Sequence, residues 1–208
     1  MAEQKGENRI SLQGMVAGEP RLTHHNHGTD YYTVPLCVPR LSGAEDVLNL
    51  VVGTPDPDLW QQGSWLQIEG EVRSYNNRTG VGPKLVITVL VRSAVQAEPS
   101  EGENRLILSG VLCKTPVRRR TPLGREICDL LLAVNRPYGR ADYLPCIAWG
   151  SLAALCGSMD VGACLRLEGR LQSRSYRKVT PEGEEKRTAY EVSVMNLLAE
   201  DEEAPQYV

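Results

Sequence analysis

The chain has 208 residues, enough for one large domain or two small ones. Its composition, 41% hydrophobic and 24% charged, is that of an ordinary globular protein and excludes a disordered or fibrous chain. No apolar run approaches the roughly 20 residues that span a bilayer, and the polar N-terminal stretch offers no apolar segment for a secretion signal, so we expect a cytoplasmic protein.

Two segments of the chain are copies of each other. The 33 residues from Asn8 align without a gap with the 33 residues from Asn104, and nine positions are identical. Farther on, GSWLQIEGEV in the first half corresponds to GACLRLEGRL in the second. The whole repeating unit is roughly 95 residues, too long for a solenoid repeat of about 20–50 residues, so we predict two domains. The predicted organisation is a first domain at 1–97, a polar linker at 98–103, a second domain at 104–199 and an acidic tail at 200–208.

Each copy is predicted to be a β domain with one short helix, at Asp56–Gln62 in the first copy and at Ser151–Met159 in the second. The second helix lies between the third and fourth of five predicted strands. That order is typical of an oligonucleotide-binding (OB) barrel. We therefore predict an all-β fold of two tandem five-stranded OB barrels. The strands predicted in the second copy are Asn104–Val111, Ile127–Asn135, Asp142–Trp149, Cys164–Tyr176 and Ala189–Leu197.

Positive charge is concentrated in the second copy. Residues 104–199 contain 15 Lys+Arg and 9 Asp+Glu, whereas residues 1–97 contain 8 Lys+Arg and 10 Asp+Glu. The formal net charge of −3 for the whole chain hides this basic module. Because local positive potential is what attracts phosphate, the second copy is the candidate nucleic-acid binder.

The cations are interleaved with aromatic residues. Tyr143 and Trp149 share one face of the predicted third strand, opposite Leu144 and Cys146. Single-stranded nucleic acid needs both kinds of residue, because cations follow its backbone while each ring that stacks on a base contributes about 1–3 kcal/mol. A duplex reader would need an element shaped for a groove, and we find no basic helix. The candidate DNA-binding residues are Arg118, Arg119, Arg120, Arg136, Tyr138, Arg140, Tyr143, Trp149, Arg170, Arg174, Tyr176, Arg177 and Lys178. The alternative is that the arginines are solvated turns and the rings are barrel core.

The second copy resembles the bacterial single-stranded DNA-binding protein (SSB) family. The blocks NRLILSGVL, DYLPCIAWGSLAAL and LRLEGRLQSRSY carry the resemblance over nearly all of 104–199, and the first copy is similar more weakly through NRISLQG and LQIEGEV. The resemblance implies an OB fold, no catalysis, and an assembly in which four OB domains present one DNA-wrapping surface. It also implies base-stacking roles for Tyr138, Tyr143, Trp149 and Tyr176.

Two features depart from the family pattern. The family typically has a long tail whose acidic tip ends in Phe and recruits replication and repair enzymes, whereas EDEEAPQYV is short and has no Phe. The first copy has HHNHG where the second has RRRTPLG, and its strand VLNLVVGT lacks a ring. Trp65 alternates with Leu66 and Ile68, so we expect it to point away from its own core and to be a candidate interface residue.

Other classes of function have weaker support in the sequence. The histidines His24, His25 and His27 share one loop that lacks cysteine, so we predict no metal site. No phosphate loop, nucleophile elbow or His-Glu-x-x-His helix is present, so we predict neither an enzyme nor a cofactor. The six cysteines are predicted to be reduced and mostly buried. An OB scaffold for protein partners, as in a primosome-like assembly, and an RNA binder remain the alternatives.

The sequence thus predicts sequence-tolerant binding and protection of single-stranded DNA in replication, recombination or repair, with replication or repair proteins as possible partners. Because this chain already supplies two OB domains, one two-fold axis between two chains would complete four. We therefore expect a homodimer.

Overall fold

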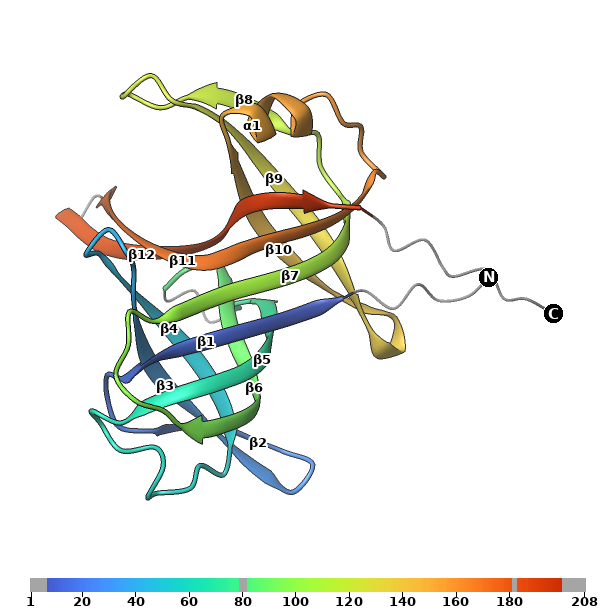
Figure 1. Ribbon diagram of the computed structural model, residues 1–208. Helices are drawn as coiled ribbons and strands as arrows, with labels where there is room; N and C mark the ends of the chain where they lie inside the picture. The colour runs from blue at the N-terminus through green and yellow to red at the C-terminus, as the bar shows by residue number, and fades with distance from the viewer. Residues whose placement is uncertain (1–6, 79–81, 181–182, 200–208) are drawn as a thin grey trace.

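A computed structural model describes residues 7–78, 82–180 and 183–199, without the side chains of 178–180 and 186 (Figure 1). Over those residues the chain forms twelve strands, one α-helix and one short 3-10 helix. The all-β class predicted from the sequence is confirmed. No helix in the described part of the chain is long and apolar enough to cross a membrane.

The first repeat closes into a ring of five strands. β1 pairs with β3 and β5, β3 with β4, β4 in parallel with β6, and β6 with β5. β2 extends the ring as a hairpin with β3 and lies at one edge of the sheet. The strands are β1 (Asn8–Val16), β2 (Arg21–Asn26), β3 (Thr29–Pro39), β4 (Glu45–Gly53), β5 (Trp65–Asn76) and β6 (Leu85–Gln96).

The second repeat closes in the same way, with β7 paired to β9 and β11, β9 to β10, β10 in parallel to β12, and β12 to β11. β8 is the counterpart of β2 at the opposite edge. The elements are β7 (Glu103–Leu112), β8 (Val117–Arg120), β9 (Glu126–Arg136), η1 (Pro137–Gly139), β10 (Arg140–Trp149), α1 (Ser151–Cys156), β11 (Cys164–Thr180) and β12 (Gly183–Leu198).

The two rings are joined by antiparallel pairing of β1 with β7, which makes one continuous sheet of twelve strands (Figure 1). At the centre of this joint Ile10 pairs with Leu106. These two residues occupy the same position in the two repeats, 96 residues apart. A local two-fold axis therefore passes through this pair, and the two repeats face each other like the subunits of a symmetric dimer.

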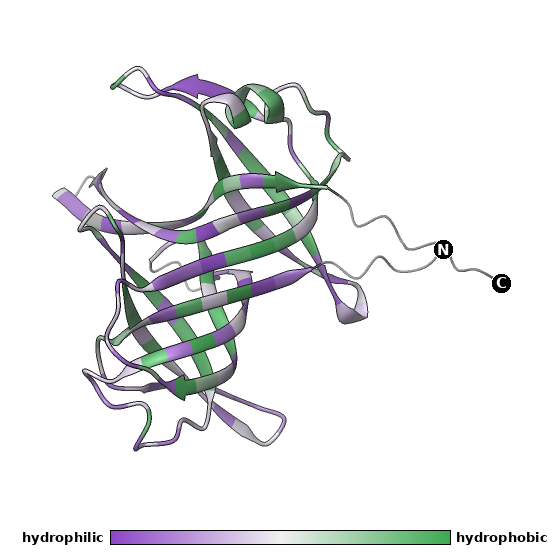
Figure 2. Cartoon of the chain, in the orientation of Figure 1, coloured by the Kyte–Doolittle hydropathy of each residue, from purple (hydrophilic) through white to green (hydrophobic). Residues whose placement is uncertain are grey.

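Alternating side chains build the core of each ring. On β1 the buried Ile10 and Leu12 alternate with half-buried polar residues, and on β7 Leu106 and Leu108 are buried in the same way. Figure 2 shows this alternation as bands along the central strands, whereas β8 is mostly hydrophilic. β8 therefore contributes little to the core, which agrees with its place at the edge of the sheet.

Gly14 and Gly110, which are identical in the repeat, lie where two strands approach closely. A Cβ on Gly14 would stand 2.4 Å from the carbonyl oxygen of Cys37, and a Cβ on Gly110 would stand 2.8 Å from that of Ala133. Those oxygens belong to β3 and β9, the strands that close each ring against β1 and β7. Closure of the ring thus requires glycine at both positions.

The helix predicted at Asp56–Gln62 is wrong. This segment consists of turns, in which the backbone N–H groups of Leu59 and Trp60 both donate to the Asp56 carbonyl, at 3.2 and 3.0 Å. Pro57 removes a backbone donor from the segment. Trp60 is only 3% exposed, so packing of its ring into the core sets the path of this loop.

The structure also changes the bounds of several predicted elements, most of all in the last hairpin, where β11 continues to Thr180 and β12 begins at Gly183 instead of at the predicted Ala189. The second helix ends at Cys156, three residues before the predicted end. Beyond it the backbone N–H groups of Ser158 and Met159 donate to the carbonyls of Leu155 and Cys156, the bonds of a turn. Val117–Arg120, which lies between the first two strands predicted for the second copy, is strand β8. All four of its side chains are exposed, so it lacks the alternation of apolar and polar residues by which strands are recognised.

Candidate nucleic-acid interface

The two faces of β10 divide as predicted. Leu144, Cys146 and Ala148 are buried in the core, whereas Tyr143 is 49% exposed and Trp149 is half-buried on the opposite face. The backbone alternation that places Leu144 inside also turns the ring of Tyr143 outward. This face of β10 therefore presents two rings outside the core of the second repeat.

The turn between β9 and β10 presents a third ring. Tyr138 is 98% exposed, and its φ of 65° lies in the left-handed region that only glycine adopts without strain. Arg140, just after the turn, is exposed and has no ion pair to any described residue. The turn therefore exposes a ring close in the chain to a cation that no described carboxylate neutralises.

The long hairpin of β11 and β12 carries the second group of candidate residues. The guanidinium of Arg174 lies 5.7 Å from the ring centroid of Tyr176, a cation–π contact. Arg177 forms an exposed ion pair with Glu184 at 3.2 Å. The side chain of Lys178 lies outside the described residues. Arg174 is thus the cation of this hairpin that stacks on a ring and is not neutralised by a carboxylate in the described part of the chain.

The three consecutive arginines of β8 are paired with carboxylates of β9. Arg119 binds Asp129 through two hydrogen bonds, the longer of 3.1 Å, and this bonding raises the pKa of the Arg119 side chain. Arg118 and Arg120 lie 3.7 and 3.1 Å from Glu126. These arginines are exposed but partly neutralised, so their contribution to the local positive potential is smaller than their number suggests.

The Arg136 side chain is bonded to other residues within the fold. Its guanidinium pairs with the fully buried carboxylate of Asp142 and donates a 3.1 Å hydrogen bond to the backbone carbonyl of Ser74 in the first repeat. Arg73 of the first repeat also reaches Asp142, at 3.1 Å. We therefore remove Arg136 from the predicted phosphate contacts, because its charge is already balanced within the fold.

Arg170, on β11, is half-buried, and its Nε is buried without a hydrogen-bond partner. A buried guanidinium nitrogen without an acceptor costs free energy. Arg170 is thus a strand cation with bonding capacity left over, in contrast to Arg136.

The contact that holds Arg136 has a counterpart in the first repeat, which the sequence comparison missed. Asp46 is 1% exposed, pairs with Arg40 and accepts a 2.6 Å hydrogen bond from the backbone N–H of Ser173. The hydrogen bond to Asp46 raises the pKa of Arg40. Extending the repeat alignment six residues past Arg40 would have shown that Asp46 and Asp142 are also identical.

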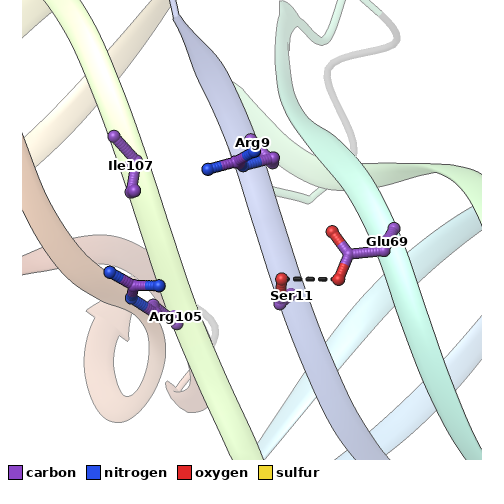
Figure 3. A pocket seen from close by; sticks show the side chains of 5 residues that line it. All are labelled: Arg9, Ser11, Glu69, Arg105 and Ile107. Carbon is purple, nitrogen blue, oxygen red and sulfur yellow. Dashed lines mark hydrogen bonds between the residues drawn. The ribbon is translucent and has the colours of Figure 1, made fainter.

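A pocket of about 300 Å³ lies over the joint between the repeats, lined by Arg9, Ser11, Glu69, Arg105 and Ile107 (Figure 3). Ser11 donates a 2.6 Å hydrogen bond to Glu69, and Arg105 is 2.6 Å from Glu168. Arg9 and Arg105 are equivalent in the repeat and extend from the neighbouring strands β1 and β7. The outer face of the joint therefore carries charges of both signs.

The histidines of the first repeat lie on the β2–β3 hairpin and contact their neighbours. His24 stacks on Tyr31 with 4.9 Å between ring centroids, and His25 bonds to Asp30 at 2.8 Å. In the residues that the structure describes, no three metal-ligating side chains gather at one point. This hairpin presents one stacked ring pair, whereas the equivalent β8–β9 hairpin presents arginines.

Trp65 points away from the core, as predicted. It pairs across β5 and β1 with Met15, and both side chains lie on the outer face, alternating with buried Leu66 and Gly14. On the neighbouring strand β6, Val95 is also exposed. Met15, Trp65 and Val95 form an outer apolar patch at one corner of the first repeat.

Comparison with known proteins identifies the second repeat. Residues 103–199 match the Single-strand binding protein family. The resemblance found in the sequence is thereby confirmed. Among curated relatives, the single-stranded DNA-binding protein of Oceanobacillus iheyensis is 32% identical over 99 residues, 44% of this chain and 58% of the relative. That of Bacillus cereus is 35% identical over 104 residues, 47% of this chain and 56% of the relative. This chain spans a little over half the length of both relatives.

Both repeats together resemble a solved structure of a single-stranded DNA-binding protein. The wild-type single-stranded DNA binding protein from Thermus aquaticus aligns over 98% of this chain and 98% of its own, with a TM-score of 0.75 and 22% sequence identity. At this identity the likeness shows the fold alone. The alignment covers both repeats and the β1–β7 joint.

Proposed function

We propose that this protein binds single-stranded DNA with little sequence preference, and thereby protects the strand and holds it open during replication, recombination or repair. The observation that carries the proposal is the β9–β10 hairpin, where the exposed rings of Tyr138 and Tyr143 lie close in the chain to the free cation Arg140, and Trp149 continues the Tyr143 face at the other end of β10. Rings of this kind accept unstacked bases while cations follow the phosphates. The family match of the same segment supports this reading.

We propose that each five-stranded ring is an OB barrel. The proposed domains are 1–97 and 104–199, with a linker at 98–103 and an acidic tail at 200–208. The strand pairings support this assignment in both repeats, and a helix between the third and fourth ring strands supports it in the second. The first repeat has turns at that place and is a barrel without a helix.

The proposed DNA contacts fall into two groups. Stacking is assigned to the exposed or half-exposed rings, and phosphate binding to cations without a full carboxylate partner. Arg118, Arg119 and Arg120 are weaker contacts, because Glu126 and Asp129 already pair with them. The proposed set is Tyr138, Tyr143, Trp149 and Tyr176 for stacking, and Arg140, Arg170 and Arg174 for phosphate. Arg177 is a weaker contact because it pairs with Glu184, and Lys178 is proposed from the sequence alone, since its side chain lies outside the described residues.

We further propose a homodimer in which two outer sheet faces meet. The local two-fold axis at Ile10 and Leu106 repeats the charges of this face, with Arg9 equivalent to Arg105 and Glu69 to Glu168, so a second copy offers complementary partners. The apolar patch around Trp65 extends the same face. Light scattering should give a mass near twice 23.0 kDa. Trp65→Glu should shift the mass toward one chain, and a monomeric unmodified chain would exclude this assembly.

The proposal assigns no catalytic step and no cofactor, and it places the protein on DNA in the bacterial cytosol, with replication or repair enzymes as candidate partners. An OB scaffold for other proteins is not favoured, because the relatives that match are single-stranded DNA-binding proteins. RNA binding shares the same stacking chemistry, so it is an outcome that the binding experiment must separate.

Tryptophan fluorescence can test the proposal. Trp60 is buried and Trp65 lies on the outer face of β5, whereas Trp149 is itself a proposed stacking ring and lies on the same face of β10 as Tyr143. Poly-dT should quench it, with poly-U and duplex DNA weaker, and log affinity should fall with log salt by about 0.7 for each phosphate neutralised. Trp149→Phe should remove most of the signal change. Equal binding of duplex, or no binding of poly-dT, would contradict the proposal.

A further inference from the structure

Ser74, at the end of β5 in the first repeat, binds the β9–β10 hairpin of the second repeat through three polar groups. Its backbone N–H donates to Asp142, its carbonyl accepts from Arg136 at 3.1 Å, and its hydroxyl oxygen accepts from the backbone N–H of Tyr143 at 2.7 Å. Ser74 is 8% exposed, so these bonds are shielded from water. Leaving any of these buried polar groups without a hydrogen-bond partner would cost free energy.

The last of these bonds acts on a proposed stacking residue. A strand side chain leaves the sheet in a direction set by its own backbone, so an atom that holds the N–H of Tyr143 also holds the direction of its ring. The ring itself is half in solvent and does not fix its own orientation by burial. The first repeat therefore contacts the β9–β10 hairpin at the backbone N–H of Tyr143, which sets the direction of the Tyr143 ring.

We propose that Ser74 is a positioning residue for single-stranded DNA binding, which holds the Tyr143 backbone so that its ring is presented to a base. This inference rests on the proposed function. It assigns the first repeat, which is not basic, a direct part in the binding site of the second.

The chain contains its own control for this role. Ser173 of the second repeat makes the same three contacts to the first repeat: its N–H donates to Asp46 at 2.6 Å, its carbonyl accepts from Arg40 at 3.2 Å, and its hydroxyl accepts from the N–H of Val47 at 3.2 Å. Val47 stands where the other repeat has Tyr143. The serine contact is therefore present in both repeats, but only Ser74 bonds the backbone of an aromatic residue.

The test compares Ser74→Ala with Ser173→Ala in the full chain. Affinity for a fluorescein-labelled oligo-dT is measured by anisotropy, and stability by urea unfolding. Ser173→Ala should lose at least as much stability as Ser74→Ala, because the Ser173 hydroxyl accepts from Val47 and also donates a 3.2 Å hydrogen bond to Asp46. Ser74→Ala should weaken binding about five- to tenfold, part of the effect of one lost stack, while Ser173→Ala should change it less than about twofold. Ser74→Thr, which keeps the hydroxyl, should restore affinity.

A double-mutant cycle with Tyr143→Ala separates positioning from general destabilisation. If Ser74 acts through the ring, Ser74→Ala should cost no further affinity once the ring is gone. Additive losses, or equal effects of Ser74→Ala and Ser173→Ala on affinity, would overturn the inference while leaving the proposed function intact. An unmodified chain that fails to bind oligo-dT would overturn both.

Discussion

Asp46 and Asp142 stand at equivalent positions of the two repeats. Each is a buried carboxylate that is bonded by residues of its own repeat and of the other repeat. Each pairs with the arginine six residues before it and accepts a backbone N–H from the opposite repeat, Ser173 for Asp46 and Ser74 for Asp142. Each repeat therefore completes the coordination of a charge buried in the other. The contact ties the two rings together at the two hairpins on either side of the β1–β7 joint.

Replacing one of these carboxylates should destabilise the whole chain. Asp142→Ala leaves Arg136 and Arg73 without their shared partner, and breaking a buried ion pair costs about 3–5 kcal/mol. Both arginines are partly exposed and can be hydrated, so we expect a loss of about 3 kcal/mol in the free energy of unfolding, measured with urea. Glu184→Ala, which breaks the exposed pair with Arg177, should cost at most about 1 kcal/mol. Similar losses for both variants would contradict the role of Asp142.

The exposed rings should contribute to binding without supporting the fold. Tyr143→Ala or Tyr176→Ala should weaken oligo-dT binding by about 1–3 kcal/mol with little change in melting temperature. Trp149→Ala should weaken oligo-dT binding and also lower the melting temperature, because this ring is half-buried. Leu41→Ala, at an exposed turn of the first repeat, is the control and should leave affinity unchanged. Tyrosine variants that unfold the domain, or bind normally, would show that these rings are structural.

Replacing Tyr138 by glycine should stabilise the fold and weaken DNA binding. Because its φ of 65° is strained for any residue with a Cβ, Tyr138→Gly should raise the free energy of unfolding by about 1 kcal/mol. The same change removes a ring that is almost wholly exposed and should weaken oligo-dT binding. Tyr138→Ala separates the effects, since it removes the ring and keeps the strain. If Tyr138→Gly binds DNA as well as the unmodified chain, this ring has no part in the site.

The cysteines should make stability fall at alkaline pH. Burial raises the pKa of Cys156 to about 11 and, together with a hydrogen bond to Glu45, that of Cys37 to about 11, from 9.0. An unfolded chain releases these protons near pH 9 and the folded chain only near pH 11. The stabilisation is thus complete below pH 9 and is lost between pH 9 and 11.

Urea unfolding at pH 8 and pH 10.5 measures this effect. Cys156→Ala should reduce the loss between the two pH values, whereas Cys164→Ser, at an exposed thiol, should leave it unchanged. A thiol reagent at pH 8 should modify exposed Cys164 first and the fully buried Cys146, whose pKa burial also raises, last. Equal reactivity of all six thiols would mean that the barrels open readily.

The sequence by itself determined the features that depend on local pattern. Gly14 and Gly110 marked the repeat, and the alternation of Tyr143 with Leu144 assigned the two faces of β10 correctly. Burial on one face of a strand forces a period of two in the sequence, so this information is carried by neighbouring residues. The charge excess of the second repeat was equally visible, since it needs only counting.

Only the tertiary structure decided which charges are available. Arg136 and Arg140 are four residues apart and look alike in sequence, but one is bound to buried Asp142 and the other is exposed. Asp142 lies only six residues from Arg136, but it is the first repeat that contacts this pair, through Ser74, 62 residues away from Arg136, which bonds both residues. The strand β8 and the missing helix near Asp56 have the same origin, because pairing with β9 and packing of Trp60 outweigh local preference. Such contacts join residues far apart in the chain, and no periodicity within a strand or helix records them.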